Sequence, residues 1–166
     1  SKIQIIQNLE GGIIDEIFVK SGDLVLKDDA LIQLDTTRFR SELSALDKEK
    51  IAAKNNLSLL NEEREILSPL VDQGVESRME LIRLLQRISD AEAQLRKTEE
   101  MEPVLKDRLE RSTVKTPMDG IVNRVLITTT GGVVQPGEPL AETVPIEEEF
   151  LIEVEVSPKD IAYVLK

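Results

Sequence analysis

Cysteine, histidine and tryptophan are absent from this chain, and the first two absences each exclude a class of function. Without cysteine there are no disulfides and no thiol nucleophiles, and without histidine the usual zinc sites and catalytic triads are excluded. A cysteine-free chain is compatible with either the cytoplasm or the periplasm. The sequence has no run of about 18 apolar residues, so it predicts neither a membrane-spanning helix nor a signal peptide.

Aromatic residues are also scarce, and acidic residues outnumber basic ones by 32 to 21. Three Phe and one Tyr are fewer aromatic residues than a single large globular core normally contains. The formal net charge of -11 argues against a nucleic-acid partner, because phosphate binding needs a concentrated basic face. The acidic runs at 62–63, 99–100 and 147–149 lack the interleaved spacing of a calcium loop and are predicted to be solvated faces and linkers. We therefore expect no metal site and no catalytic site.

One β-rich pattern occurs twice, at residues 12–31 and again, with one extra residue, at 120–140. Short apolar runs punctuated by glycine-containing turns predict strands in both copies. Neither copy has enough apolar residues to form a core alone, so together they predict one small β-sandwich. The residues expected to share its core are Ile14, Ile17, Val25, Leu31, Val122, Val125, Val134 and Leu140.

Between the two copies the apolar spacing changes to a heptad, which predicts a coiled coil. The first predicted seam is Leu43, Leu46, Lys50, Ala53, Leu57, Leu60, Arg64 and Leu67, and the returning seam is Leu81, Leu84, Ile88, Ala91, Leu95, Thr98, Glu102, Leu105, Leu109 and Ser112. Residues 35–37 are a plausible N-cap for the first arm. Pro69, Asp72 and Gly74 interrupt the pattern once, near its middle, which predicts an antiparallel hairpin.

Three charged seam positions and one proline are discordant with this pattern. Lys50, Arg64 and Glu102 are either buried partners across the hairpin or, as is more usual, charges that extend outward from the seam. Pro103 removes a helical hydrogen bond and crowds the preceding turn. Because the seam continues beyond it, we expect a kink or a short restart near residues 101–103 and not the end of the hairpin.

The predicted fold class is α+β, with a helical insertion in a split sandwich. Residues 1–35 form the first half of the sandwich, 36–112 the hairpin with its tip at about 68–77, and 113–144 the second half. Residues 145–166 contain a run of period two and are predicted to start another β-domain. The chain begins on Ser and stops after this strand-like run, so we expect it to be part of a longer protein. Such an organisation favours a reaching or bridging protein.

Residues 7–25 and 116–122 look like the split biotinyl/lipoyl motif of periplasmic adaptor proteins, also called membrane fusion proteins. The similarity is to the HlyD branch, which serves type I secretion. Residues 150–161 resemble the start of the β-barrel domain of that family. The resemblance covers nearly the whole chain, and its specificity lies in the order of half-motif, hairpin, half-motif and barrel strand.

The resemblance implies a periplasmic bridge that is not an enzyme, carries no cofactor and is anchored in the inner membrane in its full-length form. An inner-membrane ABC transporter would lie at one end, and a TolC-type outer-membrane channel would dock on the hairpin tip. Several copies would form a tube around the exported polypeptide.

The tip of several adaptors carries an Arg-Leu-x-x-Leu pattern followed by a Ser and a Leu. By this resemblance the predicted channel-binding residues are Leu67, Leu70, Ser77, Arg78 and Leu81. Ile66 stands where the family has Arg, and Arg64 or Arg78 is a candidate substitute. In the alternative interpretation the leucines only cap the coiled coil, and Ser77 caps the second helix with Glu80 at the third position. Both interpretations can hold together.

Two other functions fit parts of the same pattern. A carrier domain for biotin or lipoate needs a modified lysine in the turn between its halves, but here the helical insertion follows Asp35 in place of that turn. Lys20 and Lys27 lie in other turns and no Met-Lys-Met sequence occurs, so we expect neither cofactor. A plain coiled-coil scaffold or dimerisation module, with β-parts that only clamp the hairpin ends, remains the main alternative.

Overall fold

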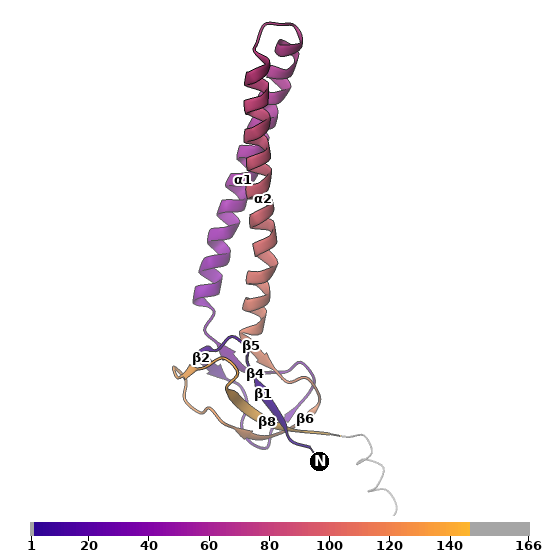
Figure 1. The fold of residues 1–166 in the computed structure, drawn as a ribbon. Coiled ribbons are helices and arrows are strands. Elements are labelled where there is room, and N and C mark those ends of the chain that lie inside the picture. The colour runs from indigo at the N-terminus through magenta and orange to yellow at the C-terminus, as the bar shows by residue number, and fades with distance from the viewer. Residues whose placement is uncertain (1, 147–166) are drawn as a thin grey trace, which may run out of the picture. The chain divides into compact units, whose positions relative to one another are not determined.

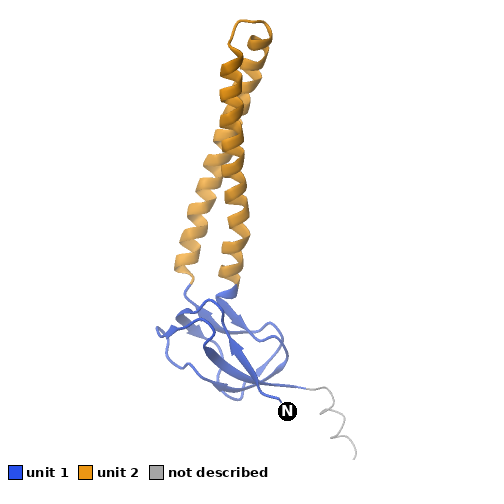
Figure 2. Ribbon diagram, viewed as in Figure 1, with its two compact units in different colours: residues 1–35, 111–166 blue, residues 36–110 orange. Residues whose placement is uncertain are grey.

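The computed structural model describes residues 2–146, which form two helices and eight strands (Figure 1). In chain order these are β1 (Gln4–Gln7), β2 (Gly12–Ile17), β3 (Leu24–Val25), β4 (Ala30–Leu34), α1 (Thr37–Asp72), α2 (Arg78–Arg111), β5 (Thr113–Lys115), β6 (Gly120–Val125), β7 (Val133–Val134) and β8 (Pro139–Pro145). The chain divides into two compact units, residues 1–35 with 111–166 and residues 36–110 (Figure 2). The predicted barrel segment lies outside the described residues except at 145 and 146.

The β-unit consists of two four-stranded antiparallel sheets, and each sheet contains strands from both repeats. Their orders are β1-β8-β6-β3 and β5-β4-β2-β7. Strand β3 of the first repeat pairs with β6 of the second, with Leu24 opposite Ile121. Strand β7 of the second repeat pairs in the same way with β2 of the first, with Ile13 opposite Val133. The predicted split sandwich with an inserted helical hairpin is confirmed, and the strand exchange explains why one repeat cannot complete a sheet alone.

The core of the sandwich is divided equally between the repeats. Residues matched by the repeat have the same exposed fractions, 1% for Ile14 and Val122, 2% for Val25 and Val134, and 0% for Leu31 and Leu140. Ile17 and Val125 are half-buried and pack against this cluster. All eight predicted core residues therefore share one core, and each fully buried aliphatic side chain contributes about 1.5–3 kcal/mol relative to exposure.

The turns after β2 and β6 are also equivalent in the repeat. The backbone of each turn donates a hydrogen bond to the other half of the sandwich. The Gly22 N–H donates to the Val122 carbonyl at 2.7 Å, and the Gly131 N–H donates to the Ile14 carbonyl at 2.8 Å. Both glycines have positive φ, 95° for Gly22 and 81° for Gly131, which other residues adopt only with strain. These hydrogen bonds join the two halves of the sandwich.

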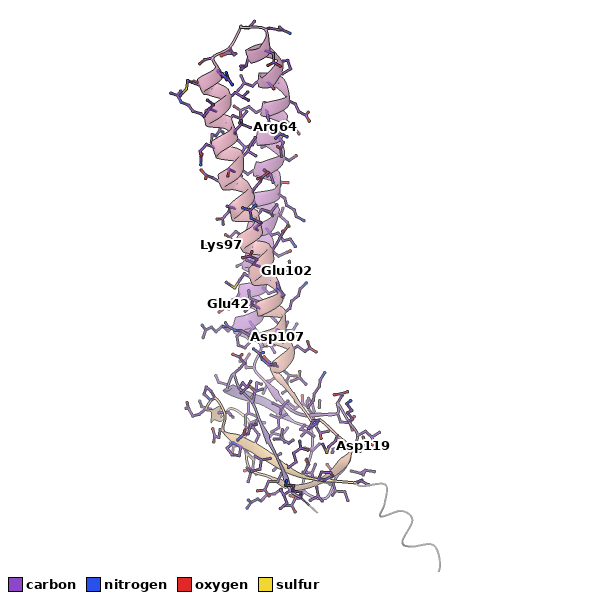
Figure 3. All side chains as sticks on the ribbon, turned by 45° about the vertical axis from the view of Figure 1, so that its right-hand side comes forward. Glu42, Arg64, Lys97, Glu102, Asp107 and Asp119 are labelled. Atoms are coloured by element: carbon purple, nitrogen blue, oxygen red, sulfur yellow. The ribbon has the colours of Figure 1, made fainter. Side chains whose placement is uncertain are left out.

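Helices α1 and α2 lie side by side and antiparallel, as Figures 1 and 2 show. Of the predicted seam positions in α1 and α2, all but Arg64 are buried or half-buried. The buried members are Leu60, Leu84, Ile88, Ala91, Thr98 and Leu105. The heptad prediction is therefore confirmed, and Arg64, whose position near the tip is labelled in Figure 3, extends into solvent as the outward interpretation expected.

Neither proline ends a helix. Helix α1 continues through Pro69 to Asp72, so residues 68–72 of the predicted tip are helical. Pro69 lacks the hydrogen bond that an N–H at its position would donate, but the helix continues beyond it, and the Gln73 N–H bonds to the Pro69 carbonyl at 3.0 Å. Helix α2 likewise runs unbroken through Pro103, so the predicted restart near 101–103 is not found. Buried seam residues on both sides of Pro103, Thr98 and Leu105, compensate for the lost bond.

Candidate partner-binding tip of the helical hairpin

The end of α1 is a Schellman motif. Gly74 has a φ of 71° and its N–H donates to the Val71 carbonyl at 3.0 Å. The Val75 N–H donates to the Leu70 carbonyl at 2.9 Å, which gives the pair of bonds that defines this helix end. The motif satisfies two carbonyl groups that would otherwise have no helical partner. It reverses the chain in the short loop 73–77.

Helix α2 begins at Arg78, and Ser77 is its N-cap. The Ser77 hydroxyl accepts a hydrogen bond from the Met79 N–H at 3.1 Å, as a capping serine does. The predicted reciprocal bond from Glu80 is not formed among the described residues, because the Glu80 carboxylate pairs with Arg83 at 2.7 Å. The capping half of the alternative interpretation is thus correct for Ser77 and incorrect for Glu80.

At the start of α1 the cap is weaker. Thr36 occupies the N-cap position as the sequence predicts, but its hydroxyl makes no hydrogen bond to the helix backbone. Instead the Thr36 Oγ1 accepts a hydrogen bond from the Arg40 Nε at 2.9 Å. The loop end of the hairpin is therefore the better-defined end in backbone terms.

The predicted tip residues fall into two groups. Leu67, Leu70 and Leu81 are half-buried, and Leu67 packs against the seam cluster that contains Leu60 and Leu84. Ser77 and Arg78 are exposed. The leucines therefore contribute to the hairpin itself and present only part of their surface to a partner.

Four apolar residues near the loop are more exposed than those leucines, and the sequence pattern did not select them as site residues. They are Ile66 at 68% exposure, Val75 at 67%, Met79 at 55% and Ile82 at 52%. All four are apolar residues at positions outside the predicted seam. That combination is the sequence signal that could have identified them as site residues. Large apolar side chains left in water around one loop are typical of a protein-binding surface. We call Ile66, Val75, Met79 and Ile82 the tip cluster.

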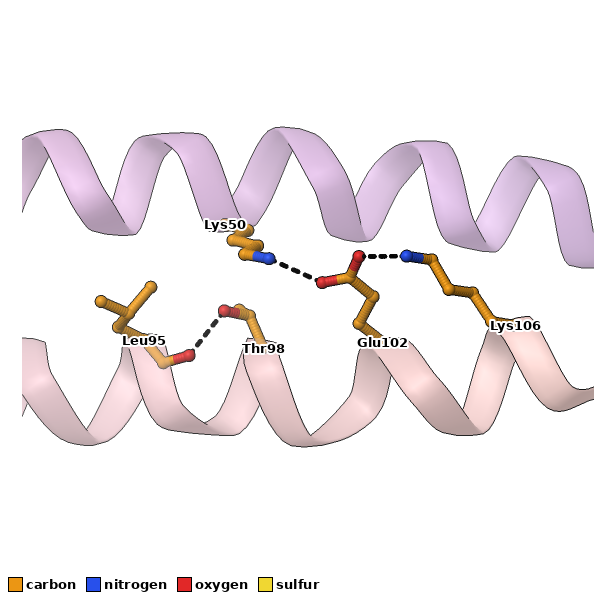
Figure 4. A network of polar contacts seen from close by, with 5 residues as sticks. All are labelled: Lys50, Leu95, Thr98, Glu102 and Lys106. Carbon is orange, nitrogen blue, oxygen red and sulfur yellow. Dashed lines mark hydrogen bonds and ion pairs between the residues drawn. The ribbon is translucent and has the colours of Figure 1, made fainter.

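Farther from the loop, the seam changes from apolar to charged (Figure 4). The Glu102 carboxylate accepts hydrogen bonds from Lys50 of α1 at 2.6 Å and from Lys106 of its own helix at 2.7 Å. Lys106 and then Lys50 lower the pKa of Glu102 to about 2, and the bond to Glu102 raises the pKa of Lys50. For Lys50 and Glu102 the pairing across the hairpin is thus correct and the outward interpretation is wrong.

A hollow of about 420 Å³ lies beside this network, between the parts of α1 and α2 most distant from the loop. Leu43, Leu46 and Leu109 line it together with Lys50 and the other members of the charged network. Apart from Thr98 and Leu105, the seam there is only half-buried, whereas the loop-proximal seam has the buried cluster of Leu60, Leu84, Ile88 and Ala91. The hairpin is consequently well packed near its tip and loosely packed at the other end.

Neither a metal centre nor a membrane-spanning helix is found among the residues that the structure describes. Between residues 2 and 146 there is no group of three or more Asp or Glu side chains placed to hold a metal ion. In that range neither helix is apolar enough over a sufficient length to cross a bilayer. The two helices instead carry charged residues along their whole length, of which Figure 3 labels Glu42, Lys97 and Asp107.

Comparison with known proteins supports one family. No protein-family model matches the chain. A segment of 74 residues is 34% identical to the type I secretion system membrane fusion protein PrsE of Rhizobium meliloti (strain 1021), and it represents 45% of this chain and 17% of that protein's length.

The comparison with solved structures agrees with the sequence comparison. The membrane fusion protein Spr0693 of Streptococcus pneumoniae R6 has a TM-score of 0.71 at 17% identity, over 94% of this chain and 68% of that one. The periplasmic adaptor protein EmrA has a TM-score of 0.52 at 17% identity, over 95% of this chain and 78% of that one. At such identities the structures show the fold. That fold is the one seen in membrane fusion and adaptor proteins, and the PrsE segment is similar in sequence to one protein of this kind.

Proposed function

We propose that this chain is the sandwich-and-hairpin part of a periplasmic adaptor for type I protein secretion. The adaptor would connect an inner-membrane ABC transporter to a TolC-type outer-membrane channel, and the channel would bind the hairpin tip. It would act in the periplasm as a homo-oligomer, anchored in the inner membrane in its full-length form. The similarity of a 74-residue segment to PrsE supports the choice of type I secretion over other efflux systems.

The observation that carries the proposal is the tip cluster beside a rigid loop. The Schellman motif and the Ser77 cap fix the backbone, so the loop presents its side chains in one arrangement. A partner that covers Ile66, Val75 and Met79 removes their apolar surface from water. Each Å² of apolar surface buried in this way stabilises the complex by roughly 25 cal/mol. Burial of a few such anchors commonly dominates an interface.

A pair of charge substitutions tests docking apart from folding. Val75 and Leu59 are similarly exposed apolar residues, at 67% and 64%, but Val75 lies in the tip loop and Leu59 within α1. Neither substitution by Asp places the charge in a core, so both variants should fold. We expect Val75→Asp to reduce secretion and channel capture by at least tenfold, or about 1.4 kcal/mol, and Leu59→Asp to leave both near wild type.

Leu70→Asp and Leu81→Asp extend this test to the half-buried residues, with Lys54→Asp as an exposed control. They should abolish secretion, but they should also lower the thermal stability of the hairpin, because both side chains pack in part against it. If secretion across all the variants declines only in proportion to lost stability, the tip is a structural cap. The scaffold alternative would then be preferred.

A further inference from the structure

Two charges of opposite sign flank the tip loop, one at the end of each helix. Asp72 is the last residue of α1, and Arg78 is the first residue of α2. Both side chains are exposed, and within residues 2–146 neither of them forms an ion pair. The loop therefore presents a negative charge on its α1 side and a positive charge on its α2 side.

Neither charge lies where its own helix favours it. The carbonyl end of a helix carries a partial negative charge, and the amino end carries a partial positive charge. An acid at the end of α1 and a base at the start of α2 are both unfavourable by this rule, and the last turn of α1 contains no basic residue. Charges that oppose local folding preferences are expected where another role requires them.

The same division of charge borders two members of the tip cluster. Residues four positions apart are neighbours on the surface of a helix. Glu62 is such a neighbour of Ile66 on α1, and Arg78 is such a neighbour of Ile82 on α2. The two isoleucines are 68% and 52% exposed. Negative charge thus borders the apolar surface of α1, and positive charge borders that of α2.

The surrounding sequence follows this division. Residues 59–76 contain five acidic residues and one basic residue, Arg64, which occupies a position of the predicted seam. Residues 77–88 contain three arginines and one glutamate. Two of these arginines are already paired, Arg83 with Glu80 at 2.7 Å and Arg87 with Glu63 at 3.4 Å. The third, at position 78, is available to a partner.

We propose that the tip docks in one orientation, in an apolar groove of the channel that has basic residues opposite α1 and an acidic residue opposite Arg78. This inference rests on the proposed function and adds the chemistry of the partner's surface. Charges at the rim of an interface raise the association rate and reject wrong registers more than they increase affinity. A tip turned the other way places Asp72 beside the acidic residue and Arg78 beside the basic ones, so the groove excludes it.

Charge reversal at the two positions separates docking from folding. Asp72→Lys and Arg78→Glu each put at a helix end the charge that the helix favours, so the hairpin should melt at the same temperature or higher. In the full chain, the same substitutions should slow association with a detergent-solubilised, immobilised TolC-type channel by about tenfold at low salt. Because the two effects have opposite directions, loss of folding cannot explain slower association.

Glu100→Lys and Lys97→Glu are the matched controls, since they change the net charge by the same amounts. Both residues are exposed on α2, about 20 residues or roughly 30 Å from the loop, which exceeds the Debye length of about 10 Å at 0.1 M salt. These variants should associate within about twofold of the wild-type rate. Near 1 M salt, all the proteins should associate at similar rates, because the Debye length falls to about 3 Å.

The outcomes distinguish this inference from the proposed function. If both tip reversals associate as fast as wild type while Val75→Asp still reduces capture, the charged groove is wrong and the proposed function stands. Equal slowing by the tip reversals and the matched controls would also overturn the groove, because it would reflect net charge alone. If the channel captures the wild-type chain at no salt concentration, both proposals fail together.

Discussion

The sandwich and the hairpin both use leucine, isoleucine and valine, but they bury these side chains in different ways. The sandwich has a core cluster of eleven buried residues, whereas the cluster in the hairpin has four, Leu60, Leu84, Ile88 and Ala91. In a two-helix arrangement each seam residue meets one neighbouring helix and then water, so few positions are enclosed. The comparison indicates that the sandwich is held by dense packing, and the hairpin by a thin seam and a well-capped loop end.

The same contrast recurs within the hairpin. One heptad spacing runs through both halves, yet the loop-proximal half has the buried cluster and the other half has Lys50, Glu102 and the hollow of about 420 Å³. Spacing determines which residues face the partner helix, but the size and charge of those residues determine whether the seam closes. The loop-proximal half is therefore suited to hold the tip rigid.

The largest expected effect lies in the sandwich. Leu31→Ala and Leu140→Ala each remove a side chain with 0% exposure, so each should lower the free energy of unfolding by about 2–5 kcal/mol. Because the two leucines are matched by the repeat, their losses should agree within about 1 kcal/mol, measured by urea unfolding followed by hydrogen exchange of the strands. A loss that is large at one position and negligible at the other would break the equivalence of the repeats.

A smaller effect is expected in the hairpin seam. Leu84→Ala removes a side chain that is 2% exposed and should cost about 2–3 kcal/mol, toward the low end for leucine because the thin seam can relax. Leu85→Ala, at a neighbouring position with 44% exposure, is the control and should cost about 0.5 kcal/mol or less. Thermal unfolding followed by helical circular dichroism distinguishes the two. Equal losses would mean that the cluster is not the stabilising part of the hairpin.

The cap at Ser77 should contribute less again. Ser77→Ala removes the acceptor for the Met79 N–H and should cost about 1 kcal/mol, whereas Ser77→Asp keeps an acceptor and should restore most of it. The melting temperature of the hairpin is the measurement. If Ser77→Asp is folded like wild type but defective in channel capture, the serine has a role in docking that is separate from capping.

The smallest effect at neutral pH, with a distinct pH signature, is expected at Glu102. Because its pKa falls from 4.5 to about 2 on folding, Glu102 stabilises the hairpin above pH 4.5, and this contribution is lost as the pH falls toward 2. Over that window the melting temperature of the wild type should decrease more than that of Glu102→Gln. Lys106→Gln removes the first partner of the carboxylate and should weaken the pH dependence. Parallel curves for all three proteins would contradict a role for the network.

The sequence was sufficient for those features that depend on local spacing. The repeat identified the core, as the equal burial of Leu31 and Leu140 shows, and the heptad identified the seam. It did not identify which strands pair, because the partner of Leu24 lies in the other repeat. Asn8 was also missed. Its buried side-chain amide donates a hydrogen bond to the carbonyl of residue 111, and nothing in the neighbouring sequence indicates that bond.

The tip was predicted less well, for physical reasons. Pro69 was taken as a break because a proline disfavours helix locally, but the turn after it keeps its own hydrogen bonds. A heptad pattern names the residues that face the partner helix and says little about the others. The tip residues were chosen by resemblance to the adaptor tip pattern, which selects Leu67 and Leu81, whereas the structure exposes Ile66 and Val75 far more.

The exchange of strands between the repeats has a consequence for synthesis on the ribosome. Gln4 pairs with Thr143, and β3 finds its partner only in β6, so the first repeat has no complete sheet while the chain is being translated. At about 5–20 residues per second, the delay before the second repeat emerges is on the order of 5–30 seconds. During that interval the hairpin can form from neighbouring sequence alone, while the strands before it present unpaired edges. We therefore expect a nascent chain of this protein to be bound by chaperones that hold extended apolar segments until translation is complete.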